Sequence, residues 1–110
     1  MTQKEICTKY QSHFNEPNPA DHINILCDAE RTSPIKLVRL NPENRSSGWY
    51  VHCGGKSSSN YSDFDPVSYL DVQREFPEIV PFLALMPGFI IEIDTNGNDD
   101  GYWSQYLLES

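Results

Sequence analysis

The sequence predicts an α+β domain: a small antiparallel sheet of two hairpins, packed by an N-terminal helix and by a helical pair interrupted by proline. Three observations predict this class. Helix-start signals occur at the beginning of the chain and again near residue 68. Strand-like stretches occur in two pairs, each separated by turn residues. Prolines at 77 and 81 interrupt the helical pattern between them. With 110 residues, of which 38% are hydrophobic, the chain is expected to form a single domain, 1–110, with one modest core.

The first element expected is a helix within residues 1–14. Thr2 to Glu5 form a capping box, because the Thr hydroxyl and the Glu carboxylate can each accept a hydrogen bond from a free backbone N–H. Apolar side chains then recur at helical spacing, at Ile6, Tyr10 and Phe14. Two prolines in residues 15–19 end the helix. Residues 15–34 are predicted to be an irregular connection that leads into an α+β core over residues 35–110.

The first hairpin is expected over residues 35–53. Residues 35–40 alternate apolar and basic side chains except at Val38, which is typical of a strand with one buried face. Turn-forming residues 41–47 follow, and residues 48–53 form the partner strand. One face of this second strand is expected to hold Trp49, Val51 and Cys53, and the other Tyr50 and His52.

Helices and a second hairpin follow. The Ser-rich residues 54–64 are predicted to be a mobile loop, and Ser68 with Asp71 starts a helix that Pro77 breaks. Pro77 can also open a second helix, PEIVPFLAL, as a first-turn proline. After the Pro87-Gly88 turn, residues 89–94 and 102–107 are predicted to pair across a hairpin turn.

No metal or other cofactor is predicted. Asp94, Asn96, Asn98 and Asp100 have the alternate spacing of a calcium loop, but its sixth and twelfth positions hold Asp99 and Gln105 instead of Gly and Glu. The three cysteines have no metal or redox spacing and are expected to be thiols in a reducing compartment. Because no secretory signal or membrane span is visible, a cytoplasmic location is expected.

Charge favours a protein partner over a nucleic acid or a membrane. The formal net charge is −8; residues 57–110 carry −9 and residues 35–56 carry +3. Such a field repels phosphates and anionic lipids and attracts a basic surface, although acidity can also serve solubility alone.

Catalytic motifs are missing, so an enzyme is not predicted. The expected contacts combine acids with an aromatic anchor: Asp94, Asn96, Asp99, Asp100 and Tyr102, with Asp63 and Asp65 as a second cluster. Trp103 fits either the core or this interface.

The order of these segments resembles the thirty-third numbered family of bacterial toxin immunity proteins, over almost the whole chain from Lys4 to Leu108. Its most specific pieces are Ser47-Gly48-Trp49 and residues 77–85 followed by Pro87-Gly88. The resemblance implies a protein without catalysis that binds and neutralises a cognate toxin delivered between bacteria. The chain departs from the family pattern at residues 54–56, where relatives carry Gly-Glu-Glu, and at residues 89–91, where they carry Trp-Arg-Phe. No fixed functional site can therefore be carried over.

Two functions are weighed. The first is an immunity protein whose acidic C-terminal half occludes a toxin with a basic surface. The second is a small regulatory or ligand-binding module with a pocket between the sheet and the helix that begins at Pro77. The oligomeric state is not predicted.

Overall fold

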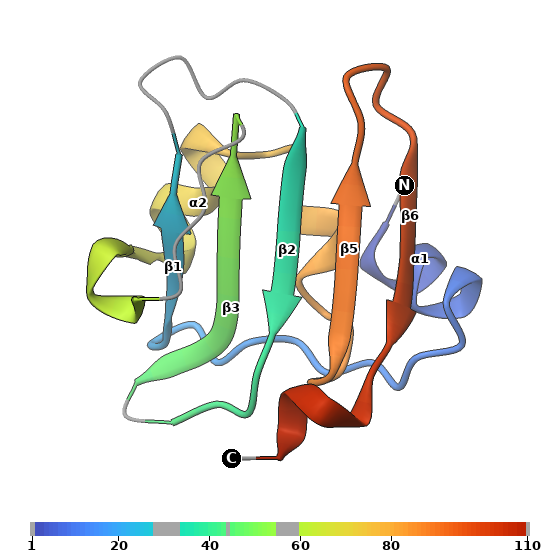
Figure 1. Cartoon of the computed structure of the whole chain (residues 1–110), viewed down its shortest axis with the longest axis horizontal. Helices are drawn as coiled ribbons and strands as arrows, with labels where there is room; N and C mark the ends of the chain where they lie inside the picture. Colours follow the sequence, from blue (N-terminus) through green and yellow to red (C-terminus); the bar gives the residue numbers. More distant parts are fainter. Residues whose placement is uncertain (1, 28–33, 44, 55–59, 110) are drawn as a thin grey trace.

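Six strands form one mixed sheet in the order β4-β1-β3-β2-β5-β6 (Figure 1). The computed structural model describes residues 2–27, 34–43, 45–54 and 60–109. The strands are β1 His22–Leu26, β2 Ile35–Arg39, β3 Ser46–Cys53, β4 Asp65–Ser68, β5 Phe89–Ile93 and β6 Asp99–Trp103. β1 and β3 run parallel, whereas all the other neighbouring strands run antiparallel.

Short helices cover one face of this sheet. The α-helices are α1 Gln3–Lys9 and α2 Tyr69–Glu75, and the 3-10 helices are η1 Tyr61–Asp63, η2 Val80–Phe82 and η3 Gln105–Leu108. In Figure 1, α1, α2 and η2 lie behind the sheet. Both predicted helix starts are confirmed: Thr2 and Glu5 form the capping box, and Ser68 Oγ accepts a hydrogen bond from the backbone N–H of Asp71 at 3.1 Å. No helix in the described part of the chain is long and apolar enough to span a membrane.

The predicted sheet of two hairpins is wrong because two further strands extend it. Both predicted hairpins are present, as β2 with β3 and β5 with β6. The last strand, expected over residues 102–107, instead ends at Trp103, and residues 105–108 form η3. β1, however, lies inside the segment 15–34 that was expected to be irregular, and it pairs with β3 on one side and β4 on the other. β1 is buried on both faces, so it lacks the alternation of a half-buried strand. β4 has four residues, including Pro66, and so gives little strand signal.

The predicted helical pair is also wrong, because only its first member, α2, is an α-helix. Residues 77–88 form turns and the single 3-10 helix η2 as they cross the covered face of the sheet. The prolines at 77 and 81 provide no backbone N–H for a helix. This segment is also buried at consecutive positions, Leu83, Ala84 and Leu85, as expected for a chain enclosed on several sides and not for an amphipathic helix.

The covered face of the sheet is centred on Arg39 and Trp49, which are almost fully buried. Trp49 Nε1 donates to the carbonyl oxygen of Leu83 at 2.9 Å. Arg39 donates to the carbonyl oxygens of Ser47 at 3.1 Å and Leu85 at 2.7 Å, and its guanidinium lies 5.5 Å from the Trp49 ring centroid. Burial lowers the pKa of Arg39 to about 10. The most specific segments of the resemblance, residues 47–49 and 77–85, therefore meet in the core.

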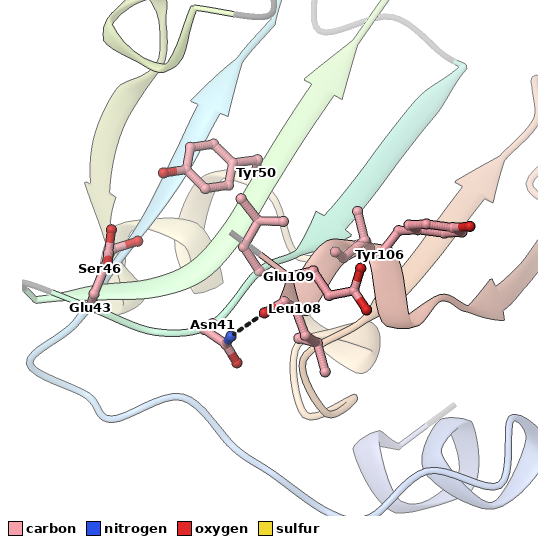
Figure 2. A pocket seen from close by; sticks show the side chains of 9 residues that line it. Asn41, Glu43, Ser46, Tyr50, Tyr106, Leu108 and Glu109 are labelled. Carbon is pink, nitrogen blue, oxygen red and sulfur yellow. Dashed lines mark hydrogen bonds between the residues drawn. The ribbon is translucent and has the colours of Figure 1, made fainter.

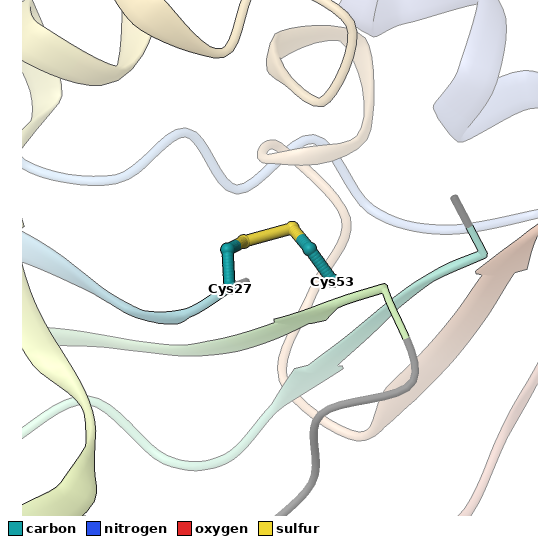
Figure 3. The surroundings of a disulfide bond; sticks show 2 residues. All are labelled: Cys27 and Cys53. Atoms are coloured by element: carbon teal, nitrogen blue, oxygen red, sulfur yellow. A yellow bond between two sulfur atoms is a disulfide. The ribbon is translucent and has the colours of Figure 1, made fainter. Parts of the chain in front are cut away.

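A disulfide joins Cys27 to Cys53 beside the ends of β1 and β3, with a Cα–Cα distance of 4.3 Å (Figure 3). Because the two strands are parallel neighbours, their carboxyl ends lie at the same edge of the sheet. The expectation that both cysteines are thiols is wrong, whereas Cys7 is free and buried. Of the loop predicted over residues 54–64, residues 55–59 lie outside the described residues, and η1 occupies its end.

Candidate functional site

The uncovered side of the sheet presents a continuous row of aromatic and aliphatic side chains. Strand alternation places Trp49 and Ile91 on the covered face and their neighbours Tyr50 and Ile90 on the other, which we call the open face. The register pairs Tyr50 with Val38, Val38 with Ile90, and Ile90 with Tyr102. These four residues, the apolar row, therefore cross β3, β2, β5 and β6. Tyr50, Val38 and Ile90 are half-buried, and Tyr102 is 61% exposed.

A charged row runs beside the apolar row. The register pairs His52 with Lys36, Lys36 with Glu92, and Glu92 with Asp100. Both carboxylates of this row lie on β5 and β6, which form the acidic end of the open face. An apolar strip with a polar margin is the arrangement expected of a protein-binding surface.

Phe64 covers part of the open face at β3. Its ring lies 5.2 Å from the Tyr50 ring and 5.0 Å from the His52 ring, centroid to centroid, and is nearly perpendicular to both. Phe64 itself is buried. The side chains of Val38, Ile90 and Tyr102 belong to β2, β5 and β6, the strands farther from Phe64 in the sheet order.

Four of the five predicted contact residues of the β5–β6 hairpin lie on its open face or in its turn. Asp100 and Tyr102 are on the open face, and Asp94 and Asn96 are exposed in the connecting turn. Asp94 Oδ1 accepts hydrogen bonds from the backbone N–H groups of Asn96 and Asn98, both at 2.9 Å. The Asp94 carboxylate therefore shapes the turn as well as carrying charge at its surface.

Asp99 faces the opposite side from its neighbour Asp100. It accepts hydrogen bonds from Lys9 Nζ at 2.7 Å and from the Tyr10 hydroxyl, so it ties β6 to the end of α1. Burial acts to raise the pKa of Asp99, but the hydrogen bonds from Lys9 and Tyr10 outweigh it, and the pKa lies below its ordinary value. Burial, together with the hydrogen bond to Asp99, raises the pKa of Tyr10. The immediate role of Asp99 in the fold is therefore structural.

Asp63 and Asp65 lie apart from the other predicted contacts. They are exposed on η1 and β4, and β4 is the edge strand opposite β6 in the sheet order. The structure thus brings together Asp94, Asn96, Asp100 and Tyr102 but separates them from this second cluster by the width of the sheet.

Trp103 belongs partly to the core and partly to the surface. Its register partner is Phe89, so it shares the covered face, but it is 43% exposed at the edge. Its Nε1 donates to the carbonyl oxygen of Pro87 at 3.0 Å. Gly88 has a φ of +107°, and a Cβ on it would lie 2.3 Å from the Trp103 indole nitrogen. The Trp103 ring therefore packs directly against the Pro87-Gly88 turn, at a position where only glycine leaves room for it.

Sequence reasoning placed Tyr50 on the face opposite Trp49 but did not identify Tyr50, Val38 or Ile90 as contact residues. The available signal was Val38, the one apolar side chain where the alternation of β2 required a polar one. A strand that is apolar on both faces is enclosed by other elements or presents an apolar surface. Only the position of α1, α2 and η2, which lie behind the sheet, distinguishes these cases.

A pocket of about 420 Å³ lies at one end of the open face, where η3 approaches β2 and β3 (Figure 2). Its sheet-side lining includes Leu40 and Tyr50, and its other wall is residues 106–109. Asn41 Nδ2 donates to the carbonyl oxygen of Leu108 at 3.3 Å, which holds η3 against the end of β2.

Among the described residues, no group of three His, Cys, Asp or Glu side chains is placed to hold a metal ion. The surfaces described above offer aromatic and aliphatic contact area, carboxylates and a pocket.

Comparison with known proteins identifies the family. No curated protein and no solved structure matches the chain. The family described as the Imm33-like domain matches residues 2–104, which include every strand of the sheet. This agrees with the resemblance seen in the SGW and PEIVPFLALMPG segments. The chain therefore belongs to the Imm33-like domain family.

Proposed function

We propose that this protein is an immunity protein that binds a cognate bacterial toxin and neutralises it by occlusion, without catalysis of its own. Its family supports an immunity role. The observation that carries the binding proposal is the apolar row, which reaches the surface on a sheet face that the described helices leave uncovered at β2 and β5. Apolar strips with polar margins mark interaction sites on small proteins.

Charge supports a toxin with a basic surface. The chain carries −8 overall, and the carboxylates of Glu92, Asp94 and Asp100 lie on the same β5–β6 hairpin as Tyr102. Opposite charges accelerate the encounter of two proteins, while a buried aromatic anchor slows their separation. We therefore propose that the apolar row forms the centre of the interface, with Asp94, Asn96 and Asp100 at its acidic margin. Asp63 and Asp65 would meet only a partner that also reaches the β4 edge.

The Cys27–Cys53 disulfide bears on the compartment in which the protein acts. Disulfides persist in oxidising compartments and are rare in the cytosol, so the Cys27–Cys53 bond argues against the expected cytoplasmic location. Alkylation of free thiols in intact cells, followed by non-reducing electrophoresis, measures whether the bond exists where the protein acts. A fully alkylated pair would restore the cytoplasmic expectation.

The alternative of a ligand-binding module required a pocket between the sheet and the helices. That space holds fully buried side chains of the core, among them Leu37, Trp49, Ile79, Leu83 and Ile91. The described pocket next to η3 lies on the other side of the sheet. No observation on the described residues favours this second function.

The test is co-expression with the product of the neighbouring gene, as the candidate toxin, followed by co-purification and a growth assay. Tyr102→Ala removes the most exposed member of the apolar row, and Leu70→Ala is its matched control, because Leu70 is 55% exposed on α2. We expect Tyr102→Ala to weaken binding about 30-fold, as truncation of an interface aromatic commonly does, and Leu70→Ala to leave it unchanged.

Two outcomes contradict this proposal. Wild-type protein that neither binds nor protects against the toxin would remove the immunity function. Equal affinities for the Tyr102→Ala and Leu70→Ala variants would move the interface away from the open face.

A further inference from the structure

We propose that the pocket between η3 and the β2–β3 end of the open face receives an arginine side chain of the toxin. This inference rests on the proposed function and deepens it by naming a point of recognition. The pocket lies next to the apolar row because Tyr50 belongs to both (Figure 2). A protein seated on that row would therefore extend over the pocket opening.

The pocket is large enough for a single long side chain. Its volume of about 420 Å³ lies at the small end of the range for ligand sites. Leu40 and Leu108 provide apolar contact for the methylene stem of the guest, and the rings of Tyr50 and Tyr106 provide aromatic surface. A flexible aliphatic stem ending in a planar polar group would match this lining.

The charge of the lining selects a cation. Glu43 and Glu109 both line the pocket and both are exposed, whereas none of its lining residues is basic. The ion pair between Lys9 and Asp99 lies at another edge of the sheet and involves neither glutamate. Both exposed carboxylates can meet an incoming positive charge. Partner and pocket would have opposite charges, as in the proposed interface as a whole.

Arginine fits this lining better than lysine. Its guanidinium is planar, stacks on tyrosine rings and binds carboxylates through two parallel hydrogen bonds. Lysine offers a compact charge that is more strongly hydrated and does not stack. Figure 2 shows the Glu109 carboxylate on the side of the pocket nearest to Tyr106, where an acid and an aromatic face are offered together.

Hydrogen bonds within the chain hold the pocket wall in place without a partner. The backbone N–H of Ser104 donates to the carbonyl oxygen of Gly88 at 2.8 Å, and Asn41 holds Leu108, so η3 is attached at both ends. The family match ends at residue 104, and this wall therefore lies outside the matched residues. A wall that is separate from the shared domain can differ between chains without disturbing the sheet.

Binding of N-acetyl-arginine amide, followed by NMR on the full chain, tests the pocket without the toxin. N-acetyl-citrulline amide is the control probe, because it has nearly the same shape but no charge. We expect saturable shifts at Tyr106, Leu108 and Glu109 with the arginine probe only. Glu109→Gln should weaken this binding about fivefold, which is the scale of an exposed ion pair. Glu92→Gln, on the same face but outside the pocket, should not change it.

Equal binding of both probes, no saturable shift at these residues, or equal losses for Glu109→Gln and Glu92→Gln would each overturn the pocket assignment. The toxin itself then separates this inference from the proposed function. If wild-type protein binds the toxin and the Glu43→Gln/Glu109→Gln variant binds it equally well, the pocket proposal fails and the immunity proposal stands. If the wild-type protein does not bind the toxin, the immunity proposal fails.

Discussion

On the covered face of the sheet, Arg39 and Trp49 are enclosed, and their polar atoms are matched to carbonyl oxygens of neighbouring segments. On the open face, one residue away along the same two strands, Val38 and Tyr50 reach the surface. The covered face makes its contacts within the chain, and each contact depends on several segments. The side chains of the open face make fewer contacts of this kind, so substitutions there cost the fold little stability.

The departure from the family pattern at residues 89–91 fits this difference. The resemblance implies Trp-Arg-Phe where this chain has Phe-Ile-Ile. Phe89 and Ile91 are buried on the covered face, and both remain apolar. The change from a charged to an apolar residue falls at Ile90, in the middle of the apolar row. A binding face that follows its partner would vary at such a position.

The largest effect expected from this comparison is on stability at the covered face. Arg39→Met should lower the free energy of unfolding by about 3–5 kcal/mol, because it leaves several buried carbonyl oxygens without a donor. Lys36→Met, an exposed position on the same strand, should change it by less than about 0.5 kcal/mol. Urea unfolding followed by Trp fluorescence measures both. A cost for Lys36→Met as large as that for Arg39→Met would remove the contrast between the faces.

The disulfide should give the next largest effect, again without touching the open face. It closes a loop with a sequence separation of 26 residues. Chain entropy then predicts that reduction lowers the free energy of unfolding by about 3 kcal/mol. The Cys27→Ala/Cys53→Ala variant should show a similar loss and no further response to reductant. Toxin affinity of the folded protein should be unchanged, and a reductant-dependent affinity in wild type alone would contradict this assignment.

The adjacent carboxylates of Asp99 and Asp100 allow a direct comparison of the covered face with the open face. Asp99→Asn should lower the free energy of unfolding by about 1 kcal/mol at neutral pH, a modest value because its partner Lys9 is 43% exposed and solvent screens the pair. Asp100→Asn should leave stability unchanged and weaken toxin binding severalfold at low salt. Thermal unfolding and titration calorimetry separate the two effects. Exchanged phenotypes would reverse our assignment of the faces.

The pH dependence of the Asp99 effect follows from its pKa. The folded-state pKa lies below the ordinary value of 3.8, so the stabilisation by Asp99 is fully present above that value. It is lost as the pH falls from 3.8 through the lower folded-state pKa. The stability difference between wild type and Asp99→Asn should therefore shrink over that interval. A difference that stays constant there would show that the carboxylate charge does not stabilise the fold.

Local patterns predicted the elements that depend on neighbours in sequence. The capping box at Thr2, the Ser68 helix start and both antiparallel hairpins were visible because side chains a few residues apart determine them. β1 was not visible, since its parallel pairing with β3 joins segments more than twenty residues apart. The Cys27–Cys53 bond was hidden for the same reason.

The candidate site was predicted only in its acidic half. Asp94, Asn96, Asp100 and Tyr102 gather on one hairpin, where sequence proximity ensures it. The apolar row needs residues from four strands, and their alignment depends on the register of the whole sheet. Asp99 and Asp100 look equivalent in sequence, but the alternation of β6 sends them to opposite faces.

By itself, the sequence determined the net negative charge, the helix starts, the two hairpins and the family, because composition and short-range spacing are sufficient for these. The tertiary structure decided which of the two faces of each strand is covered. That choice depends on where residues 77–88 and the helices pack, a set of long-range contacts that no local pattern specifies.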